Sequence, residues 1–351
     1  MEVDFLILGQ GLAGTLLSRN LMQAGNSVMV IDNNLPNCAS KTCGGIINPI
    51  TGMRLVRTWL IEELLPYALK TFIEIGKELK LQPVRQCSIL DFHPNVAAKE
   101  VFEKKAVTES QYLYSIEHTV AWEPYFRFNY GIGGIADSLQ IDIASIIMEW
   151  GRRREAEGRL MKELFDWDEL RLTDEGVVYK GINARKLICC EGAMADENPY
   201  FNRLPWSKDK GEALIAEIPD LPDTYIYKQA IGIVPLCKGL FWIGATHDWK
   251  YTDMKPTEAF RKKVEADLGY WLKVPYKIVD HLVGRRPANL DRRPFVGLHP
   301  VHQQVGILNG MGGKGCSFAP YFAHQFSAYL VEGKTIMPEV DVNRFSKVLS
   351  R

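Results

Sequence analysis

Three glycines near the start of the chain have the spacing of a nucleotide-binding turn. Gly9, Gly11 and Gly14 form a G-x-G-x-x-G pattern between an apolar run that ends at Leu8 and a segment with helical apolar periodicity. Asp32 closes a second apolar run. In a strand–turn–helix–strand unit such glycines permit a tight turn, close backbone approach to a pyrophosphate and close helix packing, while the acid binds ribose hydroxyls. The stretch therefore predicts a dinucleotide site but leaves FAD and NAD both open.

A second glycine cluster near the C-terminus is a weaker candidate for the same chemistry. Gly310, Gly312 and Gly315 also fit G-x-G-x-x-G, between the expected strand 304–309 and the expected helix 317–331. Glu332 stands at the distance of a ribose-binding acid, but it follows a helix and not a second strand. A second NAD site is therefore disfavoured. The loop is better placed to aim a helix N-terminus at an anionic part of a cofactor bound by the first motif.

The elements that must position these loops come from segments of two kinds, which alternate along the chain. Residues 1–82, 143–200 and 274–351 combine apolar strands with amphipathic helices, including a helix with kink or break at Pro66 within 54–81 and a helix opened by Asp142 as its N-cap. Residues 83–142 and 201–273 are rich in short strand-like runs, with one helix expected near the end of the second segment. We expect a discontinuous dinucleotide-binding domain with a substrate-binding domain inserted into it.

Composition excludes several classes of protein. The 351 residues are 46% hydrophobic, and 42 basic residues balance 42 acidic ones, so nucleic acid is an unlikely partner. No apolar run reaches the roughly 20 residues of a membrane-spanning helix, and the first strand begins too early for a signal peptide, which predicts a cytoplasmic protein. The seven cysteines contain no C-x-x-C pair and predict reduced thiols, and the histidine spacings predict no metal site.

The blocks along the chain, taken together, resemble the D-amino-acid oxidase-like (DAO) family of FAD-dependent oxidoreductases, which includes glycine oxidase and sarcosine oxidase. The resemblance covers nearly the whole chain and rests on four blocks in order: the N-terminal motif with Asp32, the loop ASKTCGGIINP, the strand ending in CCEGA, and the pattern GRRP…D…PFVG…NGMGGKG…AP. It implies an α/β fold, with a Rossmann-like FAD/NAD(P)-binding domain and an inserted α+β antiparallel-sheet substrate domain. It also implies one noncovalent FAD, because no cysteine matches the position of the sarcosine oxidase flavin linkage.

The resemblance assigns cofactor-binding roles to four groups of residues. The ADP half of FAD would be held by Gly9, Gly11, Gly14 and Asp32; the ribityl chain and flavin would run beside Ser40, Gly44, Gly45 and Ile47; Gly192 would lie near the pyrophosphate; and Gly312, Gly313, Lys314 and Gly315 would surround the pyrimidine edge. Lys314 would add positive charge where reduced flavin becomes anionic, although an exposed loop lysine is an equal alternative.

Arg286 matches the arginine that binds the substrate carboxylate in glycine oxidase-like members. Its planar fork suits bidentate carboxylate binding. The structural alternative is an ion pair with Asp291, and Arg285 takes the role if the register differs by one residue.

The resemblance implies oxidation of an amino acid or secondary amine, with the α-hydrogen passing to flavin N5 as the C–N bond becomes an imine. No dedicated base is needed if the amine enters neutral. Trp242 takes the position of the oxygen-activating lysine of sarcosine oxidase, so the electron acceptor, oxygen or another carrier, stays open. Gly232 replaces the substrate-facing tyrosine of glycine oxidase, which predicts a wider pocket and disfavours glycine itself.

Three other functions remain as alternatives. One is an FAD-dependent enzyme that modifies a glycine-like side chain of a tRNA uridine, which the neutral composition disfavours. Another is a flavin-binding redox or partner module without turnover. An NAD-dependent dehydrogenase is disfavoured by the C-terminal blocks.

Overall fold

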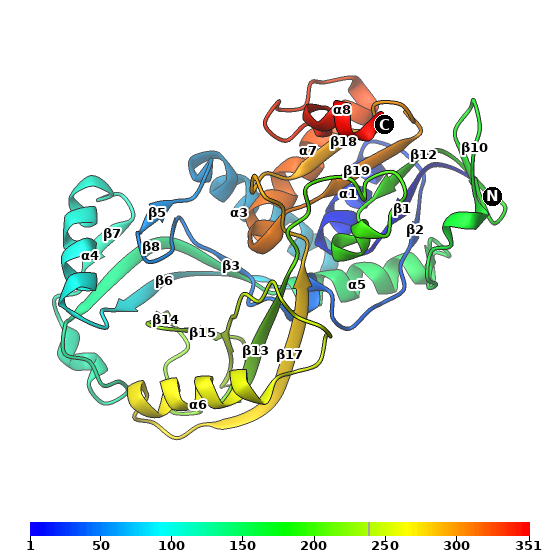
Figure 1. Cartoon of the computed structure of the whole chain (residues 1–351). Helices are drawn as coiled ribbons and strands as arrows, with labels where there is room; N and C mark the ends of the chain where they lie inside the picture. Colours follow the sequence, from blue (N-terminus) through cyan, green and yellow to red (C-terminus); the bar gives the residue numbers. More distant parts are fainter. Residues whose placement is uncertain (238) are drawn as a thin grey trace.

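In the computed structural model, which describes residues 1–237 and 239–351, the chain forms two large sheets (Figure 1). The larger helices are α1 (Leu12–Gln23), α3 (Ile61–Leu79), α4 (Val96–Thr108), α5 (Ile143–Ala156), α6 (Glu258–Trp271) and α7 (Gly315–Glu332), with short helices α2 (Ala39–Thr42) and α8 (Ser346–Leu349). Most of the longer helices pack around the first sheet, whereas α4 and α6 lie against the second. Short 3-10 helices span Thr119–Trp122, Trp167–Glu169, Gly192–Asp196, Gly312–Lys314 and Val342–Phe345.

The first sheet confirms the Rossmann-like prediction. Its strands are β1 (Glu2–Leu8), β2 (Val28–Ile31), β9 (Leu160–Met161), β10 (Leu170–Leu172), β11 (Val177–Tyr179), β12 (Ile182–Cys189), β18 (Phe295–Leu298) and β19 (Val305–Asn309). The strand order β12-β1-β2-β9 is parallel, and β19 continues the parallel pairing on β12. The carboxyl ends of β1, β2 and β12 therefore meet at one edge, which is where an α/β sheet binds its ligand.

The second sheet confirms the predicted antiparallel architecture. Its strands are β3 (Ile46–Ile47), β6 (Val84–Phe92), β7 (Leu113–Ser115), β8 (Ile132–Ile141), β13 (Asp209–Glu217), β14 (Ile226–Lys228), β15 (Gly232–Pro235), β16 (Leu240–Gly244) and β17 (Lys277–Arg286). The order is β17-β13-β16-β15-β14-β6-β8-β3, and all pairs are antiparallel except β14 with β6. A separate two-stranded ribbon joins β4 (Ile50–Thr51) to β5 (Val56–Arg57).

Two segments of the second sheet come from ranges that the sequence assigned to the cofactor domain. β17 runs through Arg286, beyond the expected boundary at 274, and pairs along its length with β13. β3 lies before the expected boundary at 82 and pairs with β8. Both segments thus carry the chain from one sheet to the other. The segment expected to form a kinked helix or two successive helices forms one helix, α3, which starts at Ile61 and contains Pro66.

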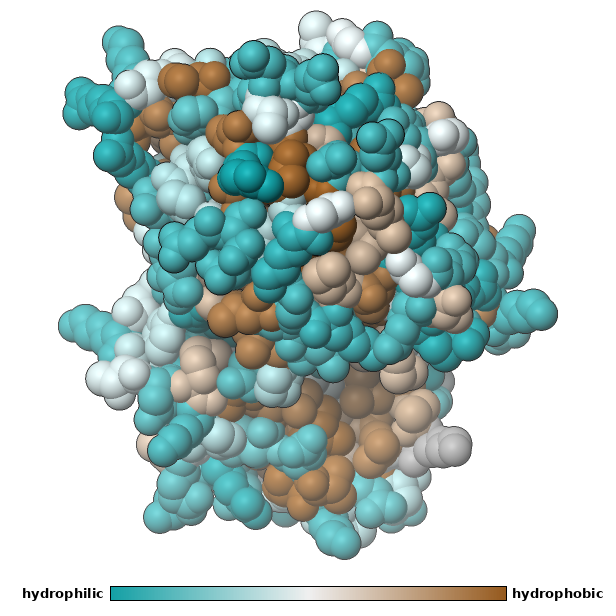
Figure 2. All heavy atoms as spheres, turned by 90° about the vertical axis from the view of Figure 1, so that its right-hand side faces the viewer, coloured by the Kyte–Doolittle hydropathy of each residue, from teal (hydrophilic) through white to brown (hydrophobic). Residues whose placement is uncertain are grey.

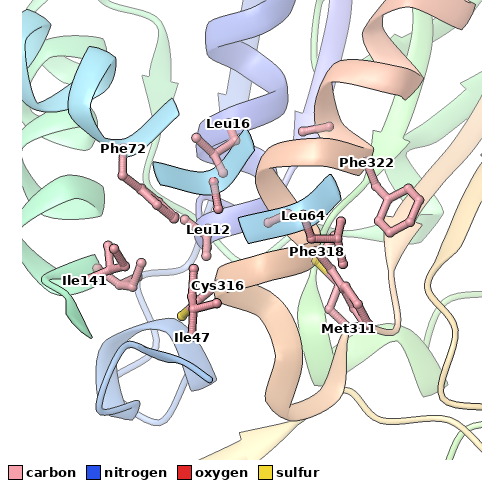
Figure 3. Close-up of a cluster of buried hydrophobic side chains, with 14 of the residues drawn as sticks. Leu12, Leu16, Ile47, Leu64, Phe72, Ile141, Met311, Cys316, Phe318 and Phe322 are labelled. Carbon is pink, nitrogen blue, oxygen red and sulfur yellow. The ribbon is translucent and has the colours of Figure 1, made fainter. Parts of the chain in front are cut away.

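One apolar core joins the helices of the first sheet to the edge of the second. It includes α1, α3 and α7 together with β3 and β8 (Figure 3). Leu12, Met311 and Cys316 belong to this core and also line the cavity described below. A second apolar cluster lies between the second sheet and α6, with Phe260, Val264 and Leu268 on the expected helix face. Packing on both sides therefore fixes the surfaces that enclose the cavity.

The outer surface is mostly polar on the face shown in Figure 2, where hydrophobic side chains (brown) form scattered groups over the upper and middle parts and a larger group in the lower part. Within the described residues no helix is both long enough and apolar enough to cross a bilayer. All seven cysteines are free thiols.

Candidate active site

A cavity of about 1260 Å³ extends from the edge of the first sheet to the face of the second. The residues that line it come from the turn after β1, the loop after β2, the end of β12, strands β13, β16 and β17, and the loop before α7. Ligand pockets are commonly about 300–1,000 Å³, so this one has room for a dinucleotide and a small second molecule.

The N-terminal motif forms one end of the cavity and has the geometry expected of it. Gly9 has φ +100°, and a Cβ there would lie 2.5 Å from the carbonyl oxygen of Cys190. Gly11 is the N-cap of α1, so the first turn of this helix offers amide donors to the cavity. A Cβ on Gly14 would overlap the carbonyl of Gly9, which explains the close packing of helix and turn.

Asp32 and Ser40 already bind this turn. Asp32 accepts hydrogen bonds from the amides of Gln10 (2.7 Å) and Asn34 (2.6 Å). Ser40 Oγ accepts one from the amide of Leu12 (3.0 Å), at the start of α1. A carboxylate can accept about four hydrogen bonds, so Asp32 retains capacity for ribose hydroxyls. A cradle of bare glycine backbone, a helix N-terminus and a carboxylate together fit the ADP half of FAD.

The glycine pair in the loop after β2 lines the middle of the cavity, and its immediate packing partners are in the second sheet. A Cβ on Gly44 would lie 2.9 Å from the ring of Trp242, whose Nε1 donates to the carbonyl of Thr42 (2.9 Å). Gly45 has φ +69° and accepts a hydrogen bond from the amide of Ile141 (2.8 Å). Both glycines are therefore required for the loop to dock on the second sheet as well as to leave space for a cofactor.

Three of the predicted site residues, Gly14, Ile47 and Lys314, lie outside the cavity wall. Ile47 is 2% exposed and belongs to the core (Figure 3). Its neighbour Ile46 lines the cavity. The Lys314 ammonium donates to Thr58 Oγ1 (3.1 Å), and burial lowers the pKa of Lys314 to about 8. Its neighbours Gly312, Gly313 and Gly315 do line the cavity. Gly232, expected to widen the pocket, is also outside the wall.

Arg286 lies in the wall on the side of the second sheet. Its Nη1 donates to Asp209 Oδ2 (2.5 Å) and to the carbonyl of Thr246 (3.0 Å). The guanidinium lies over Gly211, where a Cβ would come within 2.5 Å of the guanidinium carbon. The alternative partner Asp291 pairs instead with Arg344 (3.2 Å). Among the described residues, the guanidinium of Arg286 is therefore held through Nη1 alone, and it has room because residue 211 is a glycine.

Arg285 also lines the cavity but has different partners. Its Nη2 contacts Met194 Sδ (3.1 Å), and its amide donates to the carbonyl of Asn37 (3.2 Å). Successive residues of a strand point to opposite faces, which separates the two arginines. The carbonyl of Gly192, just after β12, accepts a hydrogen bond from Asn309 Nδ2 (2.8 Å). This bond joins the end of β12 to the loop before α7.

The sequence analysis missed three polar residues of this site: Glu191 and His247, which line the cavity, and Asp209, which is buried behind its wall. Asp209 and His247 stand at the ends of separate strands and form no local motif, so only the strand pairing brings them to Arg286. Glu191 stood within the CCEGA block as a charged residue after an apolar run, which was a usable signal. Within the described residues no group of three or more His, Cys, Asp or Glu side chains is placed to hold a metal ion.

Glu191 is an unusual carboxyl group for its position. Its Oε1 accepts from Asn198 Nδ2 (2.6 Å), but its Oε2 is buried without a hydrogen-bond partner in the described chain. Desolvation raises its pKa from 4.5 to about 7. Because it follows Cys190, which contacts Gly9, this carboxyl lies beside the predicted pyrophosphate site, where a neutral acid is tolerated better than a carboxylate.

We expect Glu191 to make the stability of the FAD-free protein depend on pH. Below pH 4.5 the carboxyl is neutral in the folded and unfolded chains alike; as pH rises to about 7, the unfolded chain ionises first and the folded state loses stability. Glu191→Gln should abolish this loss and raise the free energy of unfolding at pH 8 by roughly 1–3 kcal/mol, with little change at pH 4. Urea unfolding between pH 4 and 8 measures it, with the exposed Glu175→Gln as control. Parallel pH curves for wild type and Glu191→Gln would contradict the expectation.

Comparison with known proteins agrees with this arrangement. The family model described as DAO, FAD dependent oxidoreductase, matches residues 4–329. Iminodiacetate oxidase from Chelativorans sp. BNC1 is 20% identical with a TM-score of 0.79, and glycine oxidase from Geobacillus kaustophilus is 18% identical with a TM-score of 0.81; each comparison covers 98% of both chains. L-proline dehydrogenase from P. horikoshii is 15% identical, covers 99% of this chain and 98% of its own, and has a TM-score of 0.75. At these identities the solved structures establish the shared fold.

Proposed function

This chain belongs to the DAO family of FAD-dependent oxidoreductases, and from that premise we propose that it oxidises the C–N bond of an amino acid or secondary amine that carries a carboxylate. The observation that supports this substrate class is Arg286, a guanidinium held by Asp209 in the wall of the cavity. Glycine oxidase and iminodiacetate oxidase, which share the fold, are named for substrates that combine an amine with carboxylates.

The residues of the first sheet would hold FAD noncovalently. The turn at Gly9 and Gly11 and the first amides of α1 fit the pyrophosphate, and Asp32 fits the adenosine ribose. The loops at Gly44 and Gly312 would enclose the flavin. The amide of Gly312 donates a hydrogen bond to the carbonyl of Pro287 (3.1 Å), which holds this loop against the residues that follow Arg286. When bound, FAD supplies the two-electron acceptor for the hydrogen that leaves the substrate carbon.

The second sheet would bind and orient the substrate. Asp209 accepts a hydrogen bond from Nη1 of Arg286. The remaining N–H donors of the Arg286 guanidinium would bind the substrate carboxylate and so fix one end of the amino acid. Trp242 closes the wall beside Gly44, in the place that the resemblance gives to a lysine of sarcosine oxidase, so the electron acceptor stays open between oxygen and another carrier.

The test is a spectrum of the purified protein followed by anaerobic mixing with amines. We expect a yellow protein that releases FAD on denaturation, with its absorbance near 450 nm bleached by at least one amino acid or N-alkyl glycine. The panel pairs each amino acid with the amine that lacks its carboxylate, and the latter should bleach the flavin much more slowly. A colourless protein that cannot be reconstituted with FAD would end the proposal.

The amine panel tests one of the two remaining alternatives, and a tRNA-retention assay tests the other. A flavin-binding module without turnover would stay yellow with every amine. An enzyme acting on tRNA would require salt-sensitive retention of tRNA, which the balanced charge of the chain disfavours.

A further inference from the structure

His247 is held against a buried carboxylate, which decides which ring nitrogen donates. It lies in the loop after β16, and its Nδ1 is 2.6 Å from Asp209 Oδ2. Asp209 is 2% exposed, and hydrogen bonds and charge from His247 and Arg286 outweigh its burial and lower its pKa, so it stays ionised. An ionised carboxylate can only accept, so His247 Nδ1 must carry the hydrogen. In the neutral form of the ring, the lone pair then lies on Nε2.

The loop that carries His247 is fixed by backbone pairing. The amides of Lys210 and Asp248 donate to each other's carbonyls at 2.8 and 3.0 Å, which extends the sheet past His247 and places it beside Asp209. The imidazole stacks on Trp249, with ring centroids 5.6 Å apart and planes within 16°. Its orientation is therefore set from two sides, by a hydrogen bond and by stacking.

His247 is also accessible from the cavity and adjacent to the proposed carboxylate anchor. It lines the cavity with 55% of its side chain exposed, and its Nδ1 is 3.3 Å from Arg286 Nη1. The charged groups that face it are Asp209 from β13 and Arg286 from β17. In an α-amino acid the nitrogen is two bonds from the carboxylate carbon. A substrate carboxylate on Arg286 would therefore hold its amine near His247.

We propose that His247, oriented by Asp209, is the base that takes the proton from the substrate ammonium before C–N oxidation; this rests on the proposed function. His247 Nε2 accepts the proton and becomes imidazolium, and the amine nitrogen regains its lone pair. Bound FAD would supply the two-electron acceptor for the α-hydrogen, which would leave with the electron pair of its C–H bond as the nitrogen lone pair forms the C=N bond. Water would then hydrolyse the imine.

The test is the pH dependence of anaerobic flavin bleaching in His247→Gln. General-base catalysis commonly contributes about 10²–10⁴-fold, so we expect bleaching at pH 7 to slow by roughly 100-fold or more. At pH 10 the amine enters neutral, and the variant should come within about threefold of wild type. The His118→Gln variant, at an exposed residue that precedes the 3-10 helix Thr119–Trp122 and does not line the cavity, should follow wild type at every pH.

Two outcomes overturn the inference while leaving the proposed function standing. One is an unchanged pH profile in His247→Gln; the other is an equal loss at every pH, which would make His247 a positioning residue. If no amine bleaches the wild-type flavin, the proposed function fails first and the base role fails with it. A ¹⁵N-histidine NMR spectrum needs no substrate: we expect the His247 signal, assigned by its loss in the variant, to show Nδ1 protonated, and an Nε2-protonated ring would also overturn the inference.

Discussion

Replacing Gly9 with alanine is expected to weaken FAD binding by at least about 100-fold. Its backbone has φ +100°, where an L side chain is strained by about 1–3 kcal/mol, and the new Cβ would lie 2.5 Å from the carbonyl oxygen and 2.7 Å from the carbonyl carbon of Cys190. These are backbone atoms at the end of β12, so the turn itself must move. Titration of the FAD-free protein with FAD, followed by quenching of flavin fluorescence, measures the loss.

Gly25→Ala is the matched control. Gly25 also has a positive φ, +83°, but a Cβ there meets no heavy atom within 4 Å and Gly25 does not line the cavity. It should reduce stability slightly and leave FAD affinity unchanged. If Gly9→Ala fails to fold, Gly11→Ala replaces it, because φ there is −69° and the nearest atom to its Cβ is the flexible Ser40 Oγ at 3.2 Å. An FAD affinity within threefold of wild type in both cavity variants would contradict the assignment of this turn.

Arg286→Lys is expected to reduce the bimolecular rate of flavin bleaching by carboxylate-bearing amines by about 10- to 100-fold. Hydrogen bonds to charged groups are worth about 1.5–3 kcal/mol, and lysine keeps the charge beside Asp209 but cannot present two parallel donors to a carboxylate. Lysine also avoids the larger disturbance of an unpaired, buried Asp209, which Arg286→Ala would create. Stopped-flow reduction over a range of substrate concentrations measures the change.

Two comparisons make this result specific. Arg285→Lys should have a much smaller effect, because Arg285 contacts Met194 and not the Asp209 group. Amines without a carboxylate should be oxidised equally slowly by wild type and Arg286→Lys. If Arg285→Lys is the variant that loses the carboxylate-bearing substrates, the anchor is Arg285 and the proposed orientation is wrong.

The sequence by itself determined the features that depend on neighbouring residues. The strand, glycine turn, helix and second strand of residues 1–32 are all present, because each is specified within its own segment by apolar periodicity and by glycine conformation. The helix face of Phe260, Val264 and Leu268 and the N-cap at Asp142 were predicted on the same local basis and are confirmed. The order of the four sequence blocks then indicated the family, which the family model confirms.

Only the tertiary structure decided which side chains meet in the cavity. Side chains alternate along a strand, so a register shift of one residue exchanges the two faces, and register depends on partners far away in the sequence. That is why Ile46 and not Ile47 lines the cavity, and why Arg286 and not Arg285 meets Asp209. The group of Asp209, His247 and Arg286 comes from three strand ends that are joined only when β13 pairs with β17 and extends toward the loop after β16. No local pattern encodes that pairing, because its free energy arises from the assembled sheet.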